Sequence, residues 1–283
     1  MMRLFTLYLL LCGSAVISMA QESPVGCDTG RYTEDIFTAS KTATVQYGEN
    51  VNALGENQDL FLDVYEPDND AAEKRPLIIW AFGGSFISGS RELMAPNCLD
   101  FAKKGYVAAT IDYRLWASEN PFTLPDSTVM IDAVIKAVSD MKAAIRFFRQ
   151  DAATENRFRI DPELIFVGGI SAGGITALHT AYLDAEDDIP DFLQVALDNN
   201  GGLEGNSGDT DNLSYSSAVS GVVNMSGGLY RTEWMDADEP PLASIHGTAD
   251  ETVPFGFGIV GINILSFRVD LLSINGSDEL FVG

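Results

Sequence analysis

The sequence predicts a single α/β domain, built on a mostly parallel sheet with helices on both faces. Short apolar segments alternate along the chain with segments of helical periodicity, the pattern of parallel strands joined by helices. No internal repeat and no second domain is visible between residues 21 and 283. Hydrophobic residues make up 46% of the chain, which is enough for a substantial core. We therefore expect residues 21–283 to form one domain.

The predicted elements follow from local periodicity. The first strand alternates apolar and polar residues, whereas the later ones are apolar throughout, as strands buried on both faces are. Asp126-Ser127-Thr128 supplies an N-cap for the longest helix. In chain order we expect a strand over 59–65, a strand over 76–82, a helix over 93–104, a strand over 106–111, a helix over 129–148, a strand over 164–167, a helix over 175–183 and strands over 219–225 and 241–245. Residues 263–274 are strand-like, and no helix is predicted after them.

The first twenty residues are predicted to be a signal peptide rather than part of the fold. A short basic start precedes an apolar core over residues 4–17. Ser18-Met19-Ala20 then supplies small residues at the positions that a signal peptidase reads, which places the cleavage between Ala20 and Gln21. The segment is too short for a membrane span. We therefore expect a secreted or periplasmic protein.

Charge and cysteine content limit the partners and the compartment. The chain has 41 acidic and 17 basic residues and a net charge of −24, which argues against nucleic acid or an anionic membrane as a partner. Removal of the signal peptide leaves Cys27 and Cys98, and the sequence leaves open whether they pair. We predict no cofactor and no metal. A metal-binding reading of the acidic segment 198–211 lacks the regular spacing of a calcium loop. Residues 201–212, rich in Gly, Asn and Asp, are predicted to be a surface loop.

The most informative segment is Gly169-Ile170-Ser171-Ala172-Gly173, which lies between a predicted strand and a predicted helix. Gly-x-Ser-x-Gly in that context forms a nucleophile elbow. The turn is so tight that only small residues fit beside the serine, and it lifts the hydroxyl out at the carboxyl edge of the sheet. This motif predicts Ser171 as the nucleophile of an acyl-transfer reaction.

Two further segments supply the groups that such a serine needs. The Gly-rich segment 82–89 follows a buried strand, and its glycines let backbone N–H groups turn inward. Alone, it is equally an ordinary Gly-rich turn, but its pairing with the elbow favours an oxyanion hole completed by the N–H of Ala172. Asp250 lies in the loop after the strand over 241–245, downstream of Ser171, where the acid of a Ser…Asp…His order is expected.

The motifs resemble those of secreted bacterial α/β-hydrolases of the carboxylesterase and feruloyl-esterase-like (BD-FAE-like) group. Residues 82–89 resemble its His-Gly-Gly-Gly-Phe-x-x-Gly motif, 112–115 its Asp-Tyr-Arg-Leu, 169–174 its Gly-x-Ser-Ala-Gly-Gly and 246–254 its His-Gly-x-x-Asp-x-x-Val-Pro. The resemblance covers roughly residues 55–256 and implies the α/β-hydrolase fold and ester cleavage through an acyl-enzyme on Ser171. It also implies that the oxyanion donors are the N–H groups of Gly84, Ser85 and Ala172.

The chain departs from this pattern at three places. Phe82 replaces the histidine of the first motif, and Ser85 replaces its third glycine. The most consequential departure is that residues 251–283 contain no histidine, so no residue is assigned as the catalytic base. His179 is expected to pack within its helix, and His246 to be a structural member of its motif. We therefore expect the chain to be truncated at its C-terminus, with the last strand and helix incomplete and apolar sheet surface left uncovered.

Two functional interpretations remain open. The first is an esterase-type serine hydrolase, with Ser171 and Asp250 in the catalytic roles and little or no turnover in this chain. Its substrate would be a small-molecule or polysaccharide-linked ester. The alternative is a non-catalytic binding or adhesion protein that keeps the hydrolase fold. The missing histidine favours the alternative, whereas the retained elbow, oxyanion loop and acid favour the esterase. The sequence leaves the identity of the ester and the oligomeric state open.

Overall fold

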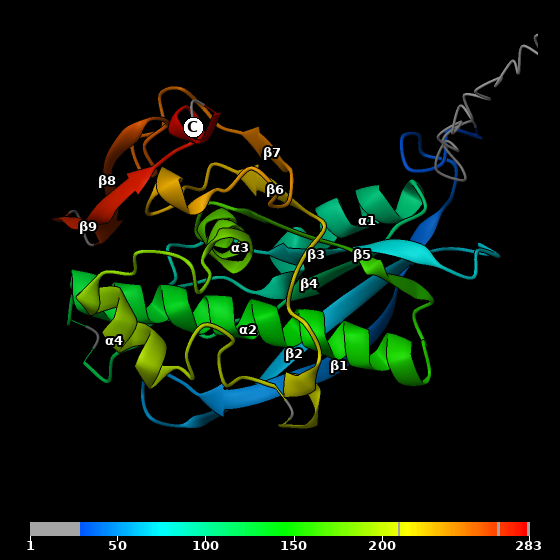
Figure 1. The fold of residues 1–283 in the computed structure, drawn as a ribbon, viewed down its shortest axis with the longest axis horizontal. Helices are drawn as coiled ribbons and strands as arrows, with labels where there is room; N and C mark the ends of the chain where they lie inside the picture. The colour runs from blue at the N-terminus through cyan, green and yellow to red at the C-terminus, as the bar shows by residue number, and fades with distance from the viewer. Residues whose placement is uncertain (1–28, 121, 209, 265–266, 282–283) are drawn as a thin grey trace, which may run out of the picture.

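The computed structural model describes residues 29–120, 122–208, 210–264 and 267–281 (Figure 1). The predicted signal peptide and Cys27 lie outside these residues, so the cleavage site and the Cys27–Cys98 pairing stay predictions. Cys98 itself is fully buried, and burial raises the pKa of its thiol well above the ordinary value. Across the described residues, no helix is both long enough and apolar enough to cross a membrane.

A seven-stranded sheet forms the centre of the molecule, in the order β1-β2-β4-β3-β5-β6-β7. β1 and β2 are antiparallel, as are β2 and β4, and every other pair is parallel. The mostly parallel sheet is therefore present as predicted. The strands are β1 (Ala39–Val51), β2 (Asn57–Pro67), β3 (Arg75–Ala81), β4 (Val107–Ile111), β5 (Ile160–Ile170), β6 (Gly221–Met225) and β7 (Leu242–Ile245).

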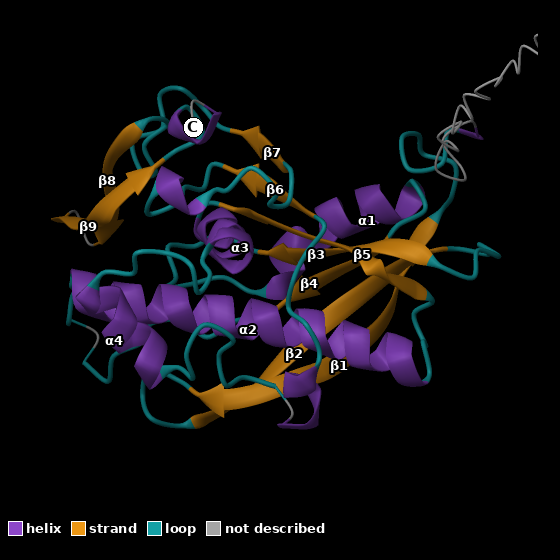
Figure 2. Cartoon of the chain, in the orientation of Figure 1, coloured by secondary structure: helices purple, strands orange, loops and turns teal. Residues whose placement is uncertain are grey.

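Helices cover both faces of this sheet (Figure 2). α1 packs on β1–β4 at one face, whereas α2 and α3 contact each other and β5 at the opposite face. Asp126 caps α2 by accepting hydrogen bonds from the N–H groups of Thr128 and Val129, as predicted. The helices are α1 (Ala95–Lys103), α2 (Ser127–Thr154), α3 (Ala172–Tyr182) and α4 (Asp191–Asn199), with 3-10 turns at Arg91–Met94, Thr210–Ser214, Thr232–Trp234 and Glu279–Phe281.

Several elements differ from the sequence prediction. β1 and α4 were not predicted from the sequence. β1 has no clear apolar pattern because it is an edge strand whose outer residues are polar and exposed. The expected strand over 263–274 is instead part of an antiparallel hairpin, β8 (Phe257–Ile264) and β9 (Phe267–Asn275), separate from the main sheet. A register irregularity between Ile259 and Gly261 interrupts the alternation that would have marked β8 in the sequence.

The segment 201–212 is only in part the surface loop that its composition predicted, with Glu204, Asn206 and Asp211 among its exposed residues. Gly205, Ser207 and Asn212 are buried, and the segment folds inward against α2. A Cβ on Gly205 would lie 2.2 Å from the Ser139 hydroxyl oxygen, so only glycine permits this approach. The Ser207 hydroxyl, which its polar neighbours in the sequence suggested would face solvent, instead makes buried hydrogen bonds with Ser139 and Asp140.

The core is deepest at β3 and β4, in which every residue is buried between the two helical layers. At the other end of the sheet the burial of β7 is incomplete: its residues alternate between partly buried and exposed, and Ile245 is 70% exposed. An apolar groove lies there, lined by Phe101 of α1, Phe166 of β5 and Leu242 of β7.

Candidate active site

Ser171 lies in a one-residue turn between β5 and α3. Its φ of 54° and ψ of −117° form a conformation that residues other than glycine rarely adopt. The Ser171 N–H donates to the carbonyl of Met225 on β6 at 2.8 Å, and its own carbonyl accepts from the N–H of Ile175 at 2.9 Å. The neighbouring strand and the first turn of α3 together hold the serine in this conformation.

The glycines on either side of Ser171 leave the space that the turn requires. A Cβ on Gly169 would lie 2.1 Å from the carbonyl carbon of Gly173. A Cβ on Gly173 would lie 2.1 Å from the carbonyl oxygen of Ala81 at the end of β3. Both distances are far inside van der Waals contact, so any larger residue would displace the backbone of the elbow.

The Gly-rich segment after β3 packs directly against this elbow. A Cβ on Gly83 would lie 3.3 Å from the Cβ of Ser171. Gly84, Ser85 and Phe86 follow with φ values of 139°, 55° and 59°, a run of left-handed backbone that turns their peptide groups. The carbonyl of Gly84 accepts hydrogen bonds from the N–H groups of Ile87 and Ser88, at 3.0 and 3.1 Å, which closes a single turn. The predicted oxyanion loop and the predicted nucleophile are thus adjacent.

The N–H groups of Gly84 and Ser85 donate no hydrogen bond within the described part of the chain. Ala172 is the first residue of α3, and the leading N–H groups of a helix lack intrahelical acceptors and carry partial positive charge. These N–H groups belong to the two segments that meet at Ser171. Such donors stabilise negative charge that develops on an oxygen.

Residues of the Asp-Tyr-Arg-Leu segment hold both ends of the oxyanion loop. The Tyr113 hydroxyl donates to the carbonyl of Phe82 at 2.7 Å, and the two rings stack with centroids 4.2 Å apart. The aromatic ring at position 82, where the family motif has histidine, thus serves packing. At the other end, Asp112 accepts hydrogen bonds from the backbone N–H and the guanidinium of Arg91. Burial raises the pKa of Asp112, and Arg91 opposes this rise by favouring the carboxylate.

Asp250 lies in the loop that follows β7. One of its carboxylate oxygens accepts hydrogen bonds from the N–H groups of Thr252 and Val253, at 2.8 and 3.0 Å. Its other oxygen lies 3.5 Å from Nε2 of His246. The carboxylate is partly exposed, and its contacts fix the shape of residues 246–256, which we call the acid loop.

The side chain of His246 is fully buried, and both of its ring nitrogens have partners. Nδ1 lies 2.9 Å from the Ser277 hydroxyl, and Nε2 lies 3.0 Å from the carbonyl oxygen of Val253. The Ser277 hydroxyl also contacts the hydroxyl of Ser244 on β7 and the amide of Asn224 on β6. This network connects the loop after β7 to the sheet, and His246 contacts both.

His179 is buried in α3 and is equally engaged. Nδ1 lies 2.8 Å from the carbonyl oxygen of Ile175, and Nε2 accepts from the N–H of Tyr230 at 3.3 Å. Burial lowers its pKa to about 4, so the imidazole is neutral at pH 7. The packing role predicted for His179 agrees with these contacts. Neither of the two histidines has a free ring nitrogen for the Ser171 proton.

One apolar pocket brings the predicted segments together. Its volume is about 40 Å³, and Ser171, Ala172, Ser85 and Thr252 contribute to its lining. The remaining walls come from apolar side chains of α2, α3, α4 and the β8–β9 hairpin. The wall that the β8–β9 hairpin contributes to the pocket was not predicted from the sequence. The only signal in the sequence was its apolar content, which does not reveal against what it packs.

No group of three or more His, Cys, Asp and Glu side chains in the described ranges is arranged to hold a metal ion. The acidic segment 198–211 therefore gains no support as a metal site, although Asp209 lies outside those ranges. The structure brings Ser171, the Gly-rich segment and the loop after β7 to one apolar pocket, whose lining includes Thr252 but not the Asp250 carboxylate.

Comparison with known proteins identifies the lineage. The BD-FAE family model matches residues 62–230. Esterase FE4 of Myzus persicae is 28% identical over 137 residues, which are 46% of this chain and 22% of that protein. Fumonisin B1 esterase of Sphingopyxis macrogoltabida is 29% identical over 129 residues, 44% of this chain and 23% of that protein. In each case the match spans less than a quarter of the relative's length.

Solved structures agree with this result. Thermogutta terrifontis esterase 2, phosphoramylated by tabun, has a TM-score of 0.55 and 28% identity, covering 80% of this chain and 77% of that one. The same esterase bound to butyrate has a TM-score of 0.52 and 27% identity, with the same coverage. These likenesses, together with the sheet order, confirm the α/β-hydrolase fold that the motifs predicted.

Proposed function

The chain belongs to the BD-FAE family and to a lineage of carboxylic ester hydrolases, and from this premise we propose that Ser171 cleaves carboxylic esters through an acyl-enzyme. The observation that carries the proposal is the contact between the elbow and the Gly-rich loop. It presents a strained serine beside unpaired backbone N–H groups at the mouth of an apolar pocket. The proposed substrate is a small ester, free or attached to a polysaccharide.

In the proposed first step, the Ser171 hydroxyl oxygen attacks the ester carbonyl carbon and its proton passes to a base. The carbonyl oxygen becomes an oxyanion that accepts hydrogen bonds from the N–H groups of Gly84, Ser85 and Ala172. The bond to the alcohol oxygen then breaks, and the alcohol leaves with a proton. Water attacks the acyl-enzyme, releases the carboxylic acid and regenerates the serine.

The base is the group that this sequence does not supply. Residues 251–283 contain no histidine, and the ring nitrogens of His179 and His246 are engaged elsewhere. Asp250 would orient and stabilise a histidine base, and here it holds the acid loop instead. We therefore expect this chain to hydrolyse esters slowly, with the residual rate that an oxyanion hole and binding provide without a complete triad. These same engaged nitrogens favour the second candidate, a non-catalytic binding protein.

Chemical rescue tests the proposal directly. Three proteins are assayed with p-nitrophenyl butyrate, with and without added imidazole: the wild-type chain, Ser171→Ala and the control Ser216→Ala. Ser216 is exposed and lies outside the pocket. Free imidazole supplies the missing base, so we expect it to raise the rate of the wild-type chain and of Ser216→Ala. The rate of Ser171→Ala with imidazole gives the hydrolysis that imidazole performs alone, which is subtracted.

The outcomes separate the candidates. A Ser171-dependent rate that imidazole increases at least tenfold supports a serine hydrolase lacking only its base. Fast Ser171-dependent hydrolysis without imidazole would show that a base is present and would point to His246. Rates equal to Ser171→Ala under all conditions would leave the binding protein as the better reading.

We further propose that the predicted signal peptide over residues 1–20 delivers this activity to the periplasm or the exterior of a bacterium. Expression of the full chain in a bacterium tests this placement. The expected result is a mature N-terminus at Gln21, found by mass spectrometry of the periplasmic or culture fraction.

A further inference from the structure

The pocket beside Ser171 has one wall that belongs neither to the elbow nor to the main sheet. Val260 and Ile262 of β8, and Leu271 and Ile274 of β9, line it and are between 1% and 9% exposed. The hairpin that carries them is a two-stranded sheet of its own, placed beyond α3 (Figure 1). The loop after β7 leads directly into β8, which places the hairpin beside the site. The hairpin is not proposed to contribute a reacting group.

The chemistry of the lining limits what the pocket can accept. Among the described residues no Asp, Glu, Lys or Arg side chain lines it, and the His179 imidazole is neutral at pH 7 because burial lowers its pKa. A charged group placed there would lose its hydration without gaining a partner. The ligand portion that enters is therefore uncharged and apolar.

The size of the pocket limits the length of that portion. The cavity volume is about 40 Å³, and a single water-sized group requires about 10–15 Å³ of such volume. The pocket thus holds about three or four groups the size of a methylene. A propionyl or butyryl chain fits this space, whereas an octanoyl chain or an aromatic ring exceeds it.

We propose that the β8–β9 hairpin is the specificity element of the site, and that it closes the pocket around the acyl chain of a short, uncharged ester. The proposal rests on the proposed function, because it places the ester carbonyl at Ser171. Ile262 is the residue that we expect to set the chain length, with Leu271 on the paired strand as the second determinant.

The anchoring of the hairpin supports this assignment. Asn275, at the end of β9, exchanges backbone hydrogen bonds with Leu229, and the N–H of Gly261 donates to the carbonyl of Thr252. The hairpin is thus held at its base and beside the acid loop. Shortening a side chain on its inner face should enlarge the pocket and leave the backbone of the elbow in place.

Binding to an unreactive chain tests the pocket separately from catalysis. In the Ser171→Ala background, Kd values for methyl butyrate, methyl octanoate and the anionic ester monomethyl succinate are measured by ligand-observed NMR. Methyl esters are used because only their acyl chain is long enough to probe the pocket. Three further variants are compared in the same background: Ile262→Ala, Leu271→Ala and the matched control Ile259→Ala, which alters the exposed side of β8.

We expect methyl butyrate to bind at least tenfold more tightly than methyl octanoate or monomethyl succinate, which reverses the usual gain in affinity with chain length. Ile262→Ala should reduce the preference over octanoate about tenfold, Leu271→Ala should act in the same direction, and Ile259→Ala should leave it unchanged. Near-UV circular dichroism checks that each variant is folded, and Leu271→Ala carries the test if Ile262→Ala is not.

Three results would overturn the proposal: tighter binding of octanoate by the parent, tighter binding of the anionic ester, or an equal effect of the inner and outer hairpin variants. None of these results depends on turnover. A chain that shows no Ser171-dependent hydrolysis even with added imidazole, but shows the expected binding pattern, would refute the proposed function and leave the pocket assignment standing.

Discussion

Ser171 and Ser85 have φ values of 54° and 55° in the two turns that meet beside the pocket. Such conformations cost about 1–3 kcal/mol each for residues other than glycine, and they persist only where surrounding structure fixes them. Here β6 and α3 fix Ser171, and the Tyr113 hydroxyl fixes the start of the loop that contains Ser85. The strain is placed where backbone donors must point at a reacting group.

His179 provides a prediction about pH. Its pKa is about 4 in the folded protein and ordinarily 6.5, so between these values the unfolded chain binds more protons than the folded one. The buried neutral imidazole therefore costs no stability above about pH 6.5, and the free energy of unfolding falls as the pH falls from 6.5 towards 4. We expect His179→Gln to remove about 3 kcal/mol of acid destabilisation between pH 7 and pH 4, measured by urea unfolding at a series of pH values.

The difference between wild type and His179→Gln isolates the effect of the histidine on the pH dependence of stability. Glu239, whose pKa burial raises to about 7, has the opposite dependence, because its stability contribution is lost as the pH rises through 7. Glu239 is present in both chains, so its effect cancels in the difference. Parallel pH profiles for wild type and His179→Gln would show that the buried imidazole does not control the acid limit.

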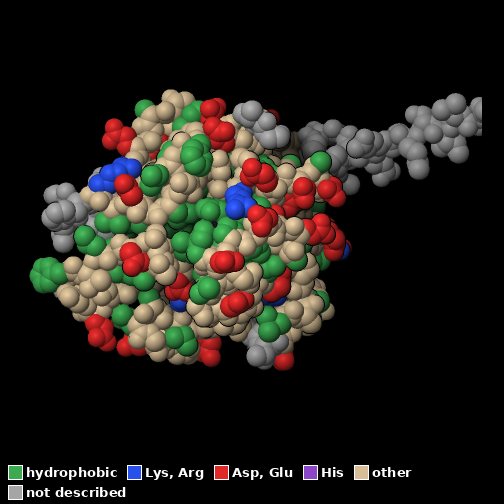
Figure 3. Space-filling model, turned by 60° about the vertical axis from the view of Figure 1, so that its left-hand side comes forward, with side chains coloured by type: hydrophobic (Ala, Val, Ile, Leu, Met, Phe, Trp, Pro, Cys, Tyr) green, Lys and Arg blue, Asp and Glu red, His purple; other side chains and the backbone are tan. Residues whose placement is uncertain are grey.

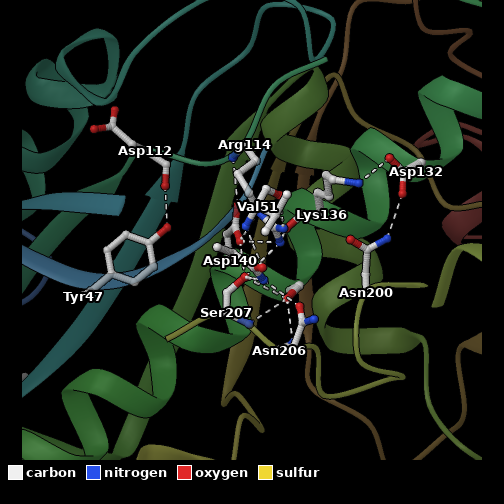
Figure 4. Close-up of polar contacts among 12 residues, drawn as sticks. Tyr47, Val51, Asp112, Arg114, Asp132, Lys136, Asp140, Asn200, Asn206 and Ser207 are labelled. Atoms are coloured by element: carbon white, nitrogen blue, oxygen red, sulfur yellow. Dashed lines mark hydrogen bonds and ion pairs between the residues drawn. The ribbon is translucent and has the colours of Figure 1, made fainter. Parts of the chain in front are cut away.

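At the scale of elements, a buried polar network joins four segments that are distant in the sequence (Figure 4). Asp140 of α2 accepts hydrogen bonds from the backbone N–H and the Nε of Arg114, at 2.8 and 3.0 Å. Arg114 also donates to the carbonyl of Val51 at the end of β1 and to the hydroxyl of Ser207. The network therefore holds the edge of the sheet, the segment after β4, α2 and the inward-folded loop in one arrangement.

Removing one partner of this network should be costly. Asp140→Ala leaves the fully buried Arg114 guanidinium without its counter-ion, and we expect a loss of about 3–5 kcal/mol in the free energy of unfolding. The double variant Arg114→Met with Asp140→Leu replaces the pair by apolar side chains and should recover most of that loss. Urea unfolding monitored by circular dichroism measures both.

Asp270→Ala is the control, because its ion pair with Arg268 is exposed and worth at most about 1 kcal/mol. The geometry of the buried pair indicates a large contribution to stability. A loss from Asp140→Ala no greater than that of the control would contradict this. If the double variant is as unstable as the single one, the network fixes more than a charge balance.

The predictability of the elements follows from their burial. β3 and β4 were visible in the sequence because strands covered on both faces are apolar throughout. β1 was not, since an edge strand with one exposed side has no such signature. The inward folding of Ser207 depends on Asp140, a partner 67 residues away, and local composition contains no information about it.

The whole molecule carries a net charge of −24. Acidic side chains are spread over the surface, and few basic ones lie among them on the face shown in Figure 3. Charges of one sign repel in the compact state more than in the expanded unfolded chain. Stability should therefore depend on how strongly the solvent screens them.

We expect sodium chloride to stabilise the protein. Raising the ionic strength from about 0.01 M to 0.15 M shortens the screening length from about 30 to 8 Å, which weakens repulsion between acidic groups. The free energy of unfolding should rise by something on the order of 1 kcal/mol. Thermal or urea unfolding at fixed pH measures it, with sucrose at matched osmolality as the uncharged control. A fall in stability with salt would show that attractive ion pairs outweigh the net repulsion.

The sequence by itself determined the fold class, the strand–turn–helix at Ser171 and the Gly-rich segment that packs beside it. These features are local: a glycine in a tight turn or an apolar strand is recognisable from its immediate neighbours. Only the tertiary structure decided that the β8–β9 hairpin lines the pocket and that the Ser207 side chain is buried against α2. Those contacts join residues far apart in the chain, and their energy depends on packing that no single segment specifies.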